Sequence, residues 1–197
     1  MCTRCPRLRK YCERIGRDNS LSFFSEVQAP RTRAVALVRA GQLTQGIAEL
    51  SKYIDPPMTT RDMRPYMVTL LAEAMSAAGD HEQALHLVGE AIEQAEAPDW
   101  QGHAHYAESL RIKGWVLQQM GRREEAEQHY RRAIDFARKQ QAKSWELRAS
   151  TSLARLLAER GEHDAARELL AVIYGWFTEG FDTKDLMEAK ALLGALH

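Results

Sequence analysis

Cysteine, proline and glycine are scarce in this sequence, and long apolar runs are missing. Of the 197 residues, 3 are cysteine, 6 are proline and 12 are glycine. All three cysteines lie within residues 1–12, so they cannot form a disulfide framework for the fold. Runs of β-branched residues are lacking, and no apolar run approaches the ~20 residues of a membrane-spanning helix. The composition predicts an all-α protein that is not inserted in a membrane.

An excess of charge of one sign is missing as well, because 27 basic residues balance 27 acidic ones. A chain without net charge has no overall attraction to nucleic acid or to anionic lipid, so neither is the expected partner. The N-terminus is basic but lacks the apolar segment of a secretory signal. These features together predict a cytoplasmic protein.

Residues 1–19 differ from the rest of the chain in composition. Six of them are Arg or Lys and only two are acidic. A zinc site could be built around Cys2, Cys5 and Cys12, but a structural zinc ion needs four ligands, and no fourth Cys or His lies nearby. We therefore expect no metal and no cofactor. Residues 1–19 are interpreted as a basic leader, and residues 20–197 as a helical repeat domain.

Four glycines at nearly regular spacing mark a repeated unit of about 40 residues. Intervals of 38, 42 and 40 residues separate Gly41, Gly79, Gly121 and Gly161. Seven positions before each glycine the residue is small, at Ala34, Ala72, Gly114 and Ala154. Five positions after it the residue is small again, at Gly46, Ala84, Ala126 and Ala166. Helices approach closely where their side chains are small, so the pattern predicts stacked helical hairpins.

Each hairpin is expected to consist of two helices joined at the glycine, which supplies a left-handed backbone conformation. The apolar periodicity predicts helices near residues 31–40 and 43–54, 64–78 and 81–95, 100–120 and 123–139, and 145–160 and 164–177. Three polar residues stand where they could cap the following helix, namely Asp80, Asp99 and Ser144.

Both ends of the repeated region are expected to be covered, because terminal units of a solenoid need caps. At the N-terminal end, residues 20–29 carry Phe23, Phe24 and Val27, which would cover the first hairpin. At the other end, a last helix over residues 182–196 would act as a capping helix. The aromatic residues that precede this helix are interpreted as packing groups.

The order of small residue, turn glycine, small residue and large apolar residue resembles the tetratricopeptide repeat (TPR), in a form lengthened to about 40 residues. The chain departs from that pattern at Gly46, where the family has alanine, and in lacking the early tryptophan of each unit. The resemblance covers residues 31–196. It implies a right-handed α-solenoid of about four TPR-like hairpins that acts as a protein-binding scaffold.

A more specific resemblance lies at the end of the chain. Residues 146–193, and above all residues 174–185, are similar to the C-terminal repeat region of bacterial proteins that join a class III nucleotide cyclase or a regulator domain to a predicted ATPase. The similarity implies a signalling or regulatory context. The cyclase and ATPase segments themselves are absent from this sequence.

Catalytic motifs with the correct spacing are not found. His81 and His86 are separated by five residues, so they cannot share a helix face as the metal-binding pair of a metalloprotease does. His103 and His105 point in different directions on a helix. Phosphate-binding glycine loops and the serine hydrolase motif are absent. The sequence therefore predicts a protein that is not an enzyme.

If the units stack like TPRs, the first helix of each hairpin lines a concave groove. The candidate partner-binding residues are Arg31, Tyr66, Glu73, Glu108, Arg111, Trp115, Gln118, Arg148 and Arg155. Further lining residues are Gln28, Val35, Val38, Thr69, Ser76 and Thr151. Tyr66 and Trp115 are the expected aromatic anchors. Arginines outnumber glutamates in this set, which favours a protein or peptide partner with acidic groups.

Other interpretations stay open at this point. The polar lining of a curved array could be only its solvated face. The protein could instead be a regulator that binds a small molecule or nucleic acid, or the sensor arm of a cyclase or ATPase system. Homo-oligomerisation through an uncapped end, with Phe23 and Phe24 as contacts, is a further alternative.

Overall fold

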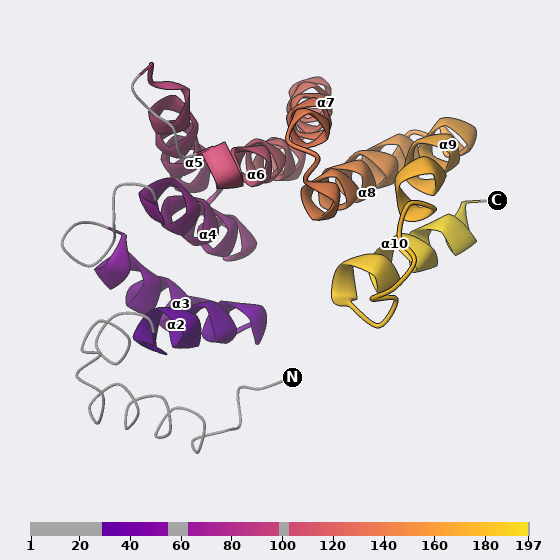
Figure 1. Cartoon of the computed structure of the whole chain (residues 1–197). Coiled ribbons are helices and arrows are strands. Elements are labelled where there is room, and N and C mark those ends of the chain that lie inside the picture. Colours follow the sequence, from indigo (N-terminus) through magenta and orange to yellow (C-terminus); the bar gives the residue numbers. More distant parts are fainter. Residues whose placement is uncertain (1–28, 55–62, 99–102, 197) are drawn as a thin grey trace. The chain divides into compact units, whose positions relative to one another are not determined.

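The computed structural model describes residues 29–54, 63–98 and 103–196, and within these ranges every regular element is a helix (Figure 1). The predicted all-α class is confirmed. The chain forms two compact units, unit 1 up to Ala91 and unit 2 from Ile92 onward. The predictions for residues 1–28, including the cysteines, Gln28 and the Phe23–Phe24 pair, concern residues outside the described ranges, as does the cap at Asp99.

Unit 1 contains the first two hairpins. Its elements are α2 (Ala29–Arg39), α3 (Leu43–Leu50), a short 3-10 helix η2 (Ser51–Tyr53), α4 (Arg64–Ala77) and the first part of α5 (His81–Glu96). Most of these bounds lie close to the predicted ones, but the α-helix predicted over residues 43–54 ends at Leu50 and gives way to the 3-10 helix η2. The core of the unit is made by Ala34, Leu50, Met67, Leu71 and Ala74. Asp80 caps α5 as predicted, because its Oδ1 accepts a hydrogen bond from the Gln83 N–H at 3.3 Å.

Unit 2 contains the later hairpins and the last helix. Its elements are the 3-10 helix η4 (His103–His105), α6 (Tyr106–Gln119), α7 (Arg123–Lys139), α8 (Lys143–Glu159), α9 (His163–Tyr174) and α10 (Lys184–Ala195). Several predicted bounds differ from the observed ones by two residues or more. The α-helix predicted from residue 100 begins only at Tyr106, because residues 103–105 form a 3-10 turn. Helix α9 ends at Tyr174, three residues early, and α10 begins at Lys184.

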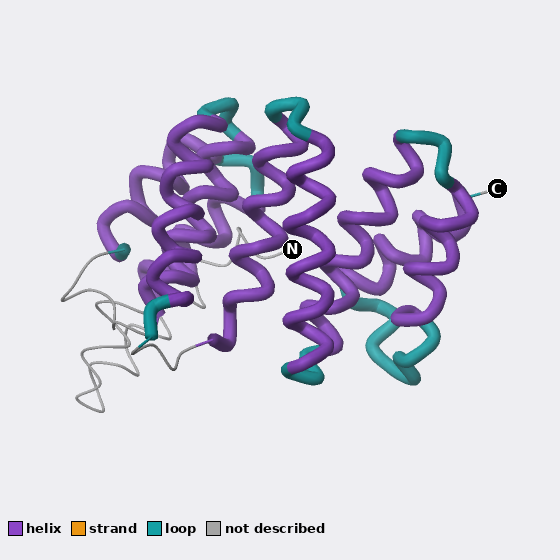
Figure 2. The backbone as a smooth tube through the Cα atoms, turned by 90° about the horizontal axis from the view of Figure 1, so that it is seen from above, coloured by secondary structure: helices purple, strands orange, loops and turns teal. Residues whose placement is uncertain are grey.

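The turns within the hairpins share one backbone geometry, in which the chain reverses through a left-handed residue. Gly41 and Gly121 both have φ of 77°. The residue after each of them donates its N–H five positions back, Gln42 to Leu37 at 3.0 Å and Arg122 to Leu117 at 2.9 Å. This is the hydrogen bonding of a Schellman motif. It explains why the loops between these helices are so short (Figure 2).

The same turn also joins α7 to α8, although no glycine marks it. Gln141 adopts φ of 56°, and the Ala142 N–H donates to the Ala137 carbonyl at 2.9 Å. The prediction that Ser144 caps this helix was wrong. Helix α8 begins one residue earlier, at Lys143, and its N-cap residue Ala142 makes no side-chain cap. The backbone turn itself sets the start of the helix here.

The small residues predicted at the helix contacts are buried. Ala34, Ala72 and Ala154 have no exposed surface. A Cβ added to Gly114 would lie 2.8 Å from Cδ1 of Tyr130, and one added to Gly46 would lie 2.9 Å from the backbone nitrogen of Val38. Gly46, which departs from the family pattern, is therefore required by the close approach of α3 to α2.

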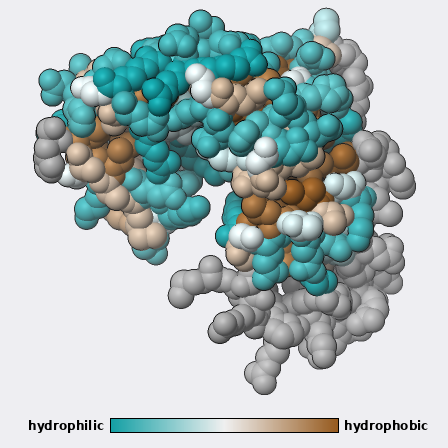
Figure 3. All heavy atoms as spheres, turned by 180° about the vertical axis from the view of Figure 1, so that it is seen from behind, coloured by the Kyte–Doolittle hydropathy of each residue, from teal (hydrophilic) through white to brown (hydrophobic). Residues whose placement is uncertain are grey.

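Apolar residues also reach the surface in unit 2. The large exposed ones are Val172 on α9, Trp176 and Phe181 in the loop before α10, and Met187 on α10. In Figure 3 brown atoms are visible over the C-terminal helices, and also over the N-terminal hairpins. Within the described ranges, no helix has the length and apolar character required to cross a membrane.

Candidate protein-binding faces

The predicted groove residues fall into two sets, one in each unit. In unit 1, Arg31 lies on α2 and is buried, whereas Tyr66 and Glu73 lie on α4 and are half-buried. In unit 2, the first helices of the hairpins carry the remaining residues, which we call the inner face. The inner face consists of Glu108, Arg111, Trp115 and Gln118 on α6, and Arg148 and Arg155 on α8.

Unit 1 has a shallow apolar depression between α2, α3 and α4. It is lined by Val35, Val38, Arg39, Leu50, Leu70 and Glu73, and its volume is about 20 Å³. Such a volume holds roughly one water-sized group, so it is not a pocket for a small-molecule ligand. Three residues predicted to line a groove (Val35, Val38 and Glu73) meet at this depression. Arg31 does not line it, and its burial lowers the pKa of the guanidinium while the charge of Tyr66 acts in the opposite direction.

Glu108 is the centre of a buried ion cluster in unit 2. Its carboxylate accepts two hydrogen bonds from Arg111, one from Nε to Oε2 and one from Nη2 to Oε1, both 2.8 Å long. Nη1 of Arg148 on α8 lies 2.8 Å from the same Oε1. Glu108 is 4% exposed, so both arginines are anchored by a carboxylate that solvent hardly reaches. Such charge-assisted, bidentate pairing fixes guanidinium orientation.

The electrostatics of the cluster favour the ionised carboxylate. Burial alone would raise the pKa of Glu108, but the charge of Arg111 and its hydrogen bonds, with the charge of Arg148, outweigh burial and lower the pKa. Burial lowers the pKa of the neighbouring His105, and the charge of Glu108 offsets this only in part. The cluster therefore holds an ionised Glu108 between two cationic arginines.

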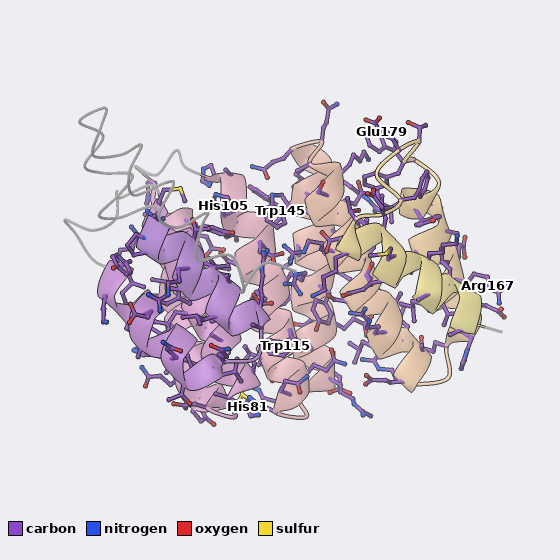
Figure 4. The ribbon with its side chains drawn as sticks, turned by 90° about the horizontal axis from the view of Figure 1, so that it is seen from below. His81, His105, Trp115, Trp145, Arg167 and Glu179 are labelled. Atoms are coloured by element: carbon purple, nitrogen blue, oxygen red, sulfur yellow. The ribbon has the colours of Figure 1, made fainter. Side chains whose placement is uncertain are left out.

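Arg148 extends the cluster to an aromatic residue and to α10. Its guanidinium carbon lies 5.3 Å from the ring centroid of Trp145, within the range of a cation–π contact. His105 meets the same ring edge-on, with 6.0 Å between centroids, and Figure 4 shows the two rings side by side. Nε of Arg148 is also 3.6 Å from Oδ1 of Asp185. The cluster thus connects α6, α8 and α10.

A second chain of contacts connects the same helices further along. The hydroxyl of the buried Tyr130 donates to Oε1 of Gln118 at 2.8 Å, and Nε2 of Gln118 donates to Glu159 on α8 at 3.1 Å. Nη2 of Arg155 donates to Oε2 of Glu188 on α10 at 3.0 Å. Trp115 lies on α6 between the two groups and is half-buried (Figure 4).

Three polar residues expected to line the groove are buried instead. Thr69 and Thr151 are 1% and 5% exposed, and their hydroxyls donate to carbonyls four residues back, at Pro65 and Leu147. Ser76 is buried and its hydroxyl lies 3.0 Å from Nδ1 of His81. These residues are therefore not exposed along a groove as expected. The hydroxyls of Thr69 and Thr151 bond to their own helices and can be buried at little cost, whereas that of Ser76 faces His81 on α5.

Sequence reasoning missed the acidic residues of α10. Asp185 and Glu188 lie against Arg148 and Arg155, so the excess of arginine along the first helices is balanced within unit 2. Both acidic residues fall within the last helix predicted over residues 182–196, which was interpreted only as a cap. The two carboxylates are three residues apart on one helix face, a spacing that aligns them with a neighbouring helix once α10 is placed beside α8.

The described residues contain no group of three His, Cys, Asp or Glu side chains arranged to hold a metal ion. The charged groups of the inner face form ion pairs with one another or with the carboxylates of α10.

Several solved structures share the fold of this chain. A putative kinesin light chain from Podosopora anserina, with nearly identical TPR-like repeats, is 17% identical, with a TM-score of 0.64 over 86% of this chain and 84% of that one. BtubC (BKLC) from P. vanneervenii is 16% identical, with a TM-score of 0.69 over 96% and 79% of the two chains. MamA is 14% identical, with a TM-score of 0.52 over 95% and 89%.

No curated protein sequence matches this chain. The family model described as tetratricopeptide repeat matches residues 66–139 and 114–174, which together cover more than half of the chain. The predicted fold class, an all-α solenoid of TPR-like hairpins, is confirmed by this match and by the similar structures. The chain belongs to the tetratricopeptide repeat family.

Proposed function

We propose that this protein is a non-catalytic scaffold that binds an acidic segment of a partner protein on the inner face of unit 2. TPR proteins commonly mediate protein–protein interaction and are generally not enzymes. The observation that carries the proposal is the anchoring of Arg111 and Arg148 by the buried Glu108. Side chains held in one geometry lose little conformational freedom when a partner binds, so more of the interaction energy appears as affinity.

An acidic partner fits the face because α10 already places carboxylates there. Asp185 and Glu188 are 42% and 39% exposed in their pairs with Arg148 and Arg155. Exposed ion pairs contribute about 0–1 kcal/mol, so a partner's Asp or Glu can replace either of them at small cost. In the free protein, Asp185 and Glu188 would then occupy the positions that the partner's carboxylates take in the complex.

Trp115 supplies the apolar part of the proposed contact. It is half-buried on α6, next to Gln118 and between the two charged groups. Aromatic residues at the centre of a contact contribute a large share of binding energy, commonly about 2 kcal/mol or more when truncated to alanine. In unit 1, we propose a separate, weaker contact surface at the apolar depression, beside Tyr66 and Glu73.

The proposal is tested by fluorescence anisotropy with Asp/Glu-rich peptides, each compared with its Asn/Gln-rich counterpart. Trp115→Ala should weaken binding of the acidic peptides at least ~10-fold, and Arg155→Gln should weaken it several-fold. Arg167→Gln is the matched control, because Arg167 is an exposed arginine on α9 (Figure 4). Equal loss in all three variants, or equal binding of acidic and neutral peptides, would contradict the proposal.

We extend the proposal to a cytoplasmic role in bacterial signalling or regulation. This context is inferred from the sequence resemblance of residues 146–193 to repeat regions of cyclase and ATPase fusion proteins alone, and the matches to known families and structures do not extend to it. Binding of nucleic acid is the alternative for a face that carries arginine. A salt titration separates the two, because phosphate contacts give a steep, linear loss of log affinity with log salt.

A further inference from the structure

Among helices α6 to α10, α10 buries the fewest residues. Its buried residues are Leu186 and Ala189, and Leu196 follows the helix as a third buried apolar residue. Helix α10 packs against α8 and α9 (Figure 1) and is joined to α9 by the loop of residues 175–183, which contains no regular helix. A helix with few buried apolar contacts that follows such a loop is expected to open before the rest of its unit.

The polar contacts between α10 and α8 are two ion pairs that solvent reaches. Asp185 lies 3.6 Å from Nε of Arg148 and Glu188 lies 3.0 Å from Nη2 of Arg155. Exposed ion pairs hold two elements together only weakly. Arg148 also pairs with the buried Glu108 of α6, a contact that does not involve α10. The cationic surface of α8 is therefore still in place when α10 detaches.

We propose that α10 is an intramolecular ligand of α8, and that the partner is a helix with the same side-chain pattern, which displaces α10. On α10 the pattern is Asp185, Leu186, Glu188 and Ala189, that is, two carboxylates three residues apart, each followed by an apolar residue. These four positions lie on one side of a helix. Displacement by such a helix presupposes the proposed function, because it needs an inner face that accepts a partner's carboxylates.

The tethered α10 sets the affinity that a partner must exceed. A segment joined by a short linker competes as though it were present at about millimolar concentration. The apparent affinity of a partner is reduced by the fraction of molecules in which α10 is detached. Acidic segments that lack the apolar positions therefore bind weakly while α10 is in place. An acidic helix with a larger apolar residue at the position of Ala189 competes better.

The first test uses a fluorescein-labelled peptide of residues 182–196, added to the full chain and followed by anisotropy, with a scrambled peptide as control. Leu186→Asp removes the buried anchor of α10 and should bind the peptide at least ~10-fold more tightly than wild type. Met187→Asp is the matched control, because it adds the same charge at a neighbouring position that is 51% exposed, and it should bind like wild type.

A double variant checks that the peptide occupies the surface that α10 leaves. Adding Arg155→Gln to Leu186→Asp should weaken peptide binding several-fold, because the peptide's second carboxylate loses its arginine. Equal peptide affinity in wild type, Leu186→Asp and Met187→Asp would overturn the proposal, as would equally tight binding of the scrambled peptide.

Hydrogen exchange of wild type separates failure of the displacement from failure of the proposed function. The probe is the peptide of residues 182–196 carrying Ala189→Leu, which also distinguishes its fragments by mass. At saturation, the amides of α10 should exchange at least ~10-fold faster, while those of α9 stay unchanged. Binding with unchanged or slower exchange in α10 would overturn the displacement and leave the proposed function standing. Absence of acidic-peptide binding from both wild type and Leu186→Asp would overturn both.

Discussion

The two units build the same hairpin but fill its inner surface with different chemistry. In unit 1 the first helices meet around aliphatic residues, Val35, Val38 and Leu70, and the described part of the unit buries no carboxylate. In unit 2 the first helices meet around Glu108, and a second buried carboxylate, Glu146, lies at the start of α8. The small-residue columns fix the hairpin, and the intervening positions are free to be apolar or ionic.

This difference has consequences for stability and for binding. Dispersion and burial hold the inner surface of unit 1 together and do not depend on protonation. The ionic surface of unit 2 depends on charge and holds arginines in fixed orientations, which a binding face requires. The tryptophans of the described residues, Trp115, Trp145 and Trp176, all lie in unit 2, so their fluorescence follows the unfolding of unit 2.

The largest effect is expected from removal of the central carboxylate. Glu108→Ala leaves Arg111 and Arg148 without their buried partner, and breaking such a pair costs about 3–5 kcal/mol. Urea unfolding monitored by tryptophan fluorescence measures this loss. Glu73→Ala, on the half-buried surface of unit 1, is the comparison variant and should cost less than about 1 kcal/mol. Similar losses in the two variants would mean that the two surfaces do not differ as described.

Acid should weaken unit 2 more than unit 1. Burial tends to raise the pKa of Glu146, but hydrogen bonds from Arg138 and Lys143, with their charges, lower it, as Arg111 does for Glu108. Because these pKa values are lower in the folded state than the ordinary 4.5, the stabilisation is complete above that pH. It is lost as the pH falls below it.

The acid effect is measured as the urea midpoint of tryptophan fluorescence at pH 7 and at pH values below 4.5. We expect the midpoint to fall with pH, and to fall less in Glu108→Gln than in wild type. A midpoint that is the same at all pH values, or an identical pH dependence in the variant, would contradict the assignment of Glu108.

Alanine at the two contact glycines should affect the units unequally. At Gly46 an added Cβ would lie 2.9 Å from the backbone nitrogen of Val38, which cannot move without shifting α2. At Gly114 it would lie 2.8 Å from ring atoms of Tyr130 and 3.0 Å from the backbone oxygen of Ala126. Overpacking costs about 1–3 kcal/mol, and we expect Gly46→Ala to lie at the upper end. Unfolding of Gly46→Ala is measured by circular dichroism, and unfolding of Gly114→Ala is measured by tryptophan fluorescence. Stabilisation by Gly46→Ala would show that α2 and α3 are not in such close contact.

The smallest effect is expected at the turn between α7 and α8. Gln141 has positive φ, a conformation that costs a residue with a side chain up to ~1–2 kcal/mol more than glycine. Gln141→Gly should stabilise unit 2 by up to about 1 kcal/mol, since the greater freedom of glycine in the unfolded chain offsets part of the gain. Gln141→Asn is the intermediate control. Destabilisation by glycine would contradict this turn geometry.

The hairpins could be predicted from the sequence because steric rules determine them. Small residues opposite large ones, with a left-handed glycine between, leave few alternatives to two antiparallel helices. The turn at Gln141 could not be found in this way, because glutamine carries no local preference for positive φ. The early end of α9 was missed for a similar reason, since Trp176 and Phe177 continue the apolar periodicity beyond Tyr174.

The candidate site was predictable only in part. The positions of Glu108, Arg111, Arg148 and Arg155 follow from helical periodicity. Glu108, Arg111 and Arg148 meet in one cluster, whereas Arg155 pairs separately with Glu188. Which charges pair across helices depends on the placement of α10. Because a long loop at residues 175–183 precedes this helix, the sequence does not indicate how α10 is aligned along α8. Thr69 and Thr151 illustrate a second limit, because a hydroxyl can face solvent or bond to its own helix with the same sequence pattern.

The most direct test of the inner face is the affinity of an acidic peptide for the double variant Asp185→Asn, Glu188→Gln, compared with wild type at equal ionic strength. If Asp185 and Glu188 occupy the arginines that a partner uses, neutralising them should tighten binding up to several-fold for each pair released. Unchanged or weaker binding of the acidic peptide, with the fold intact by circular dichroism, would contradict the assignment of this face.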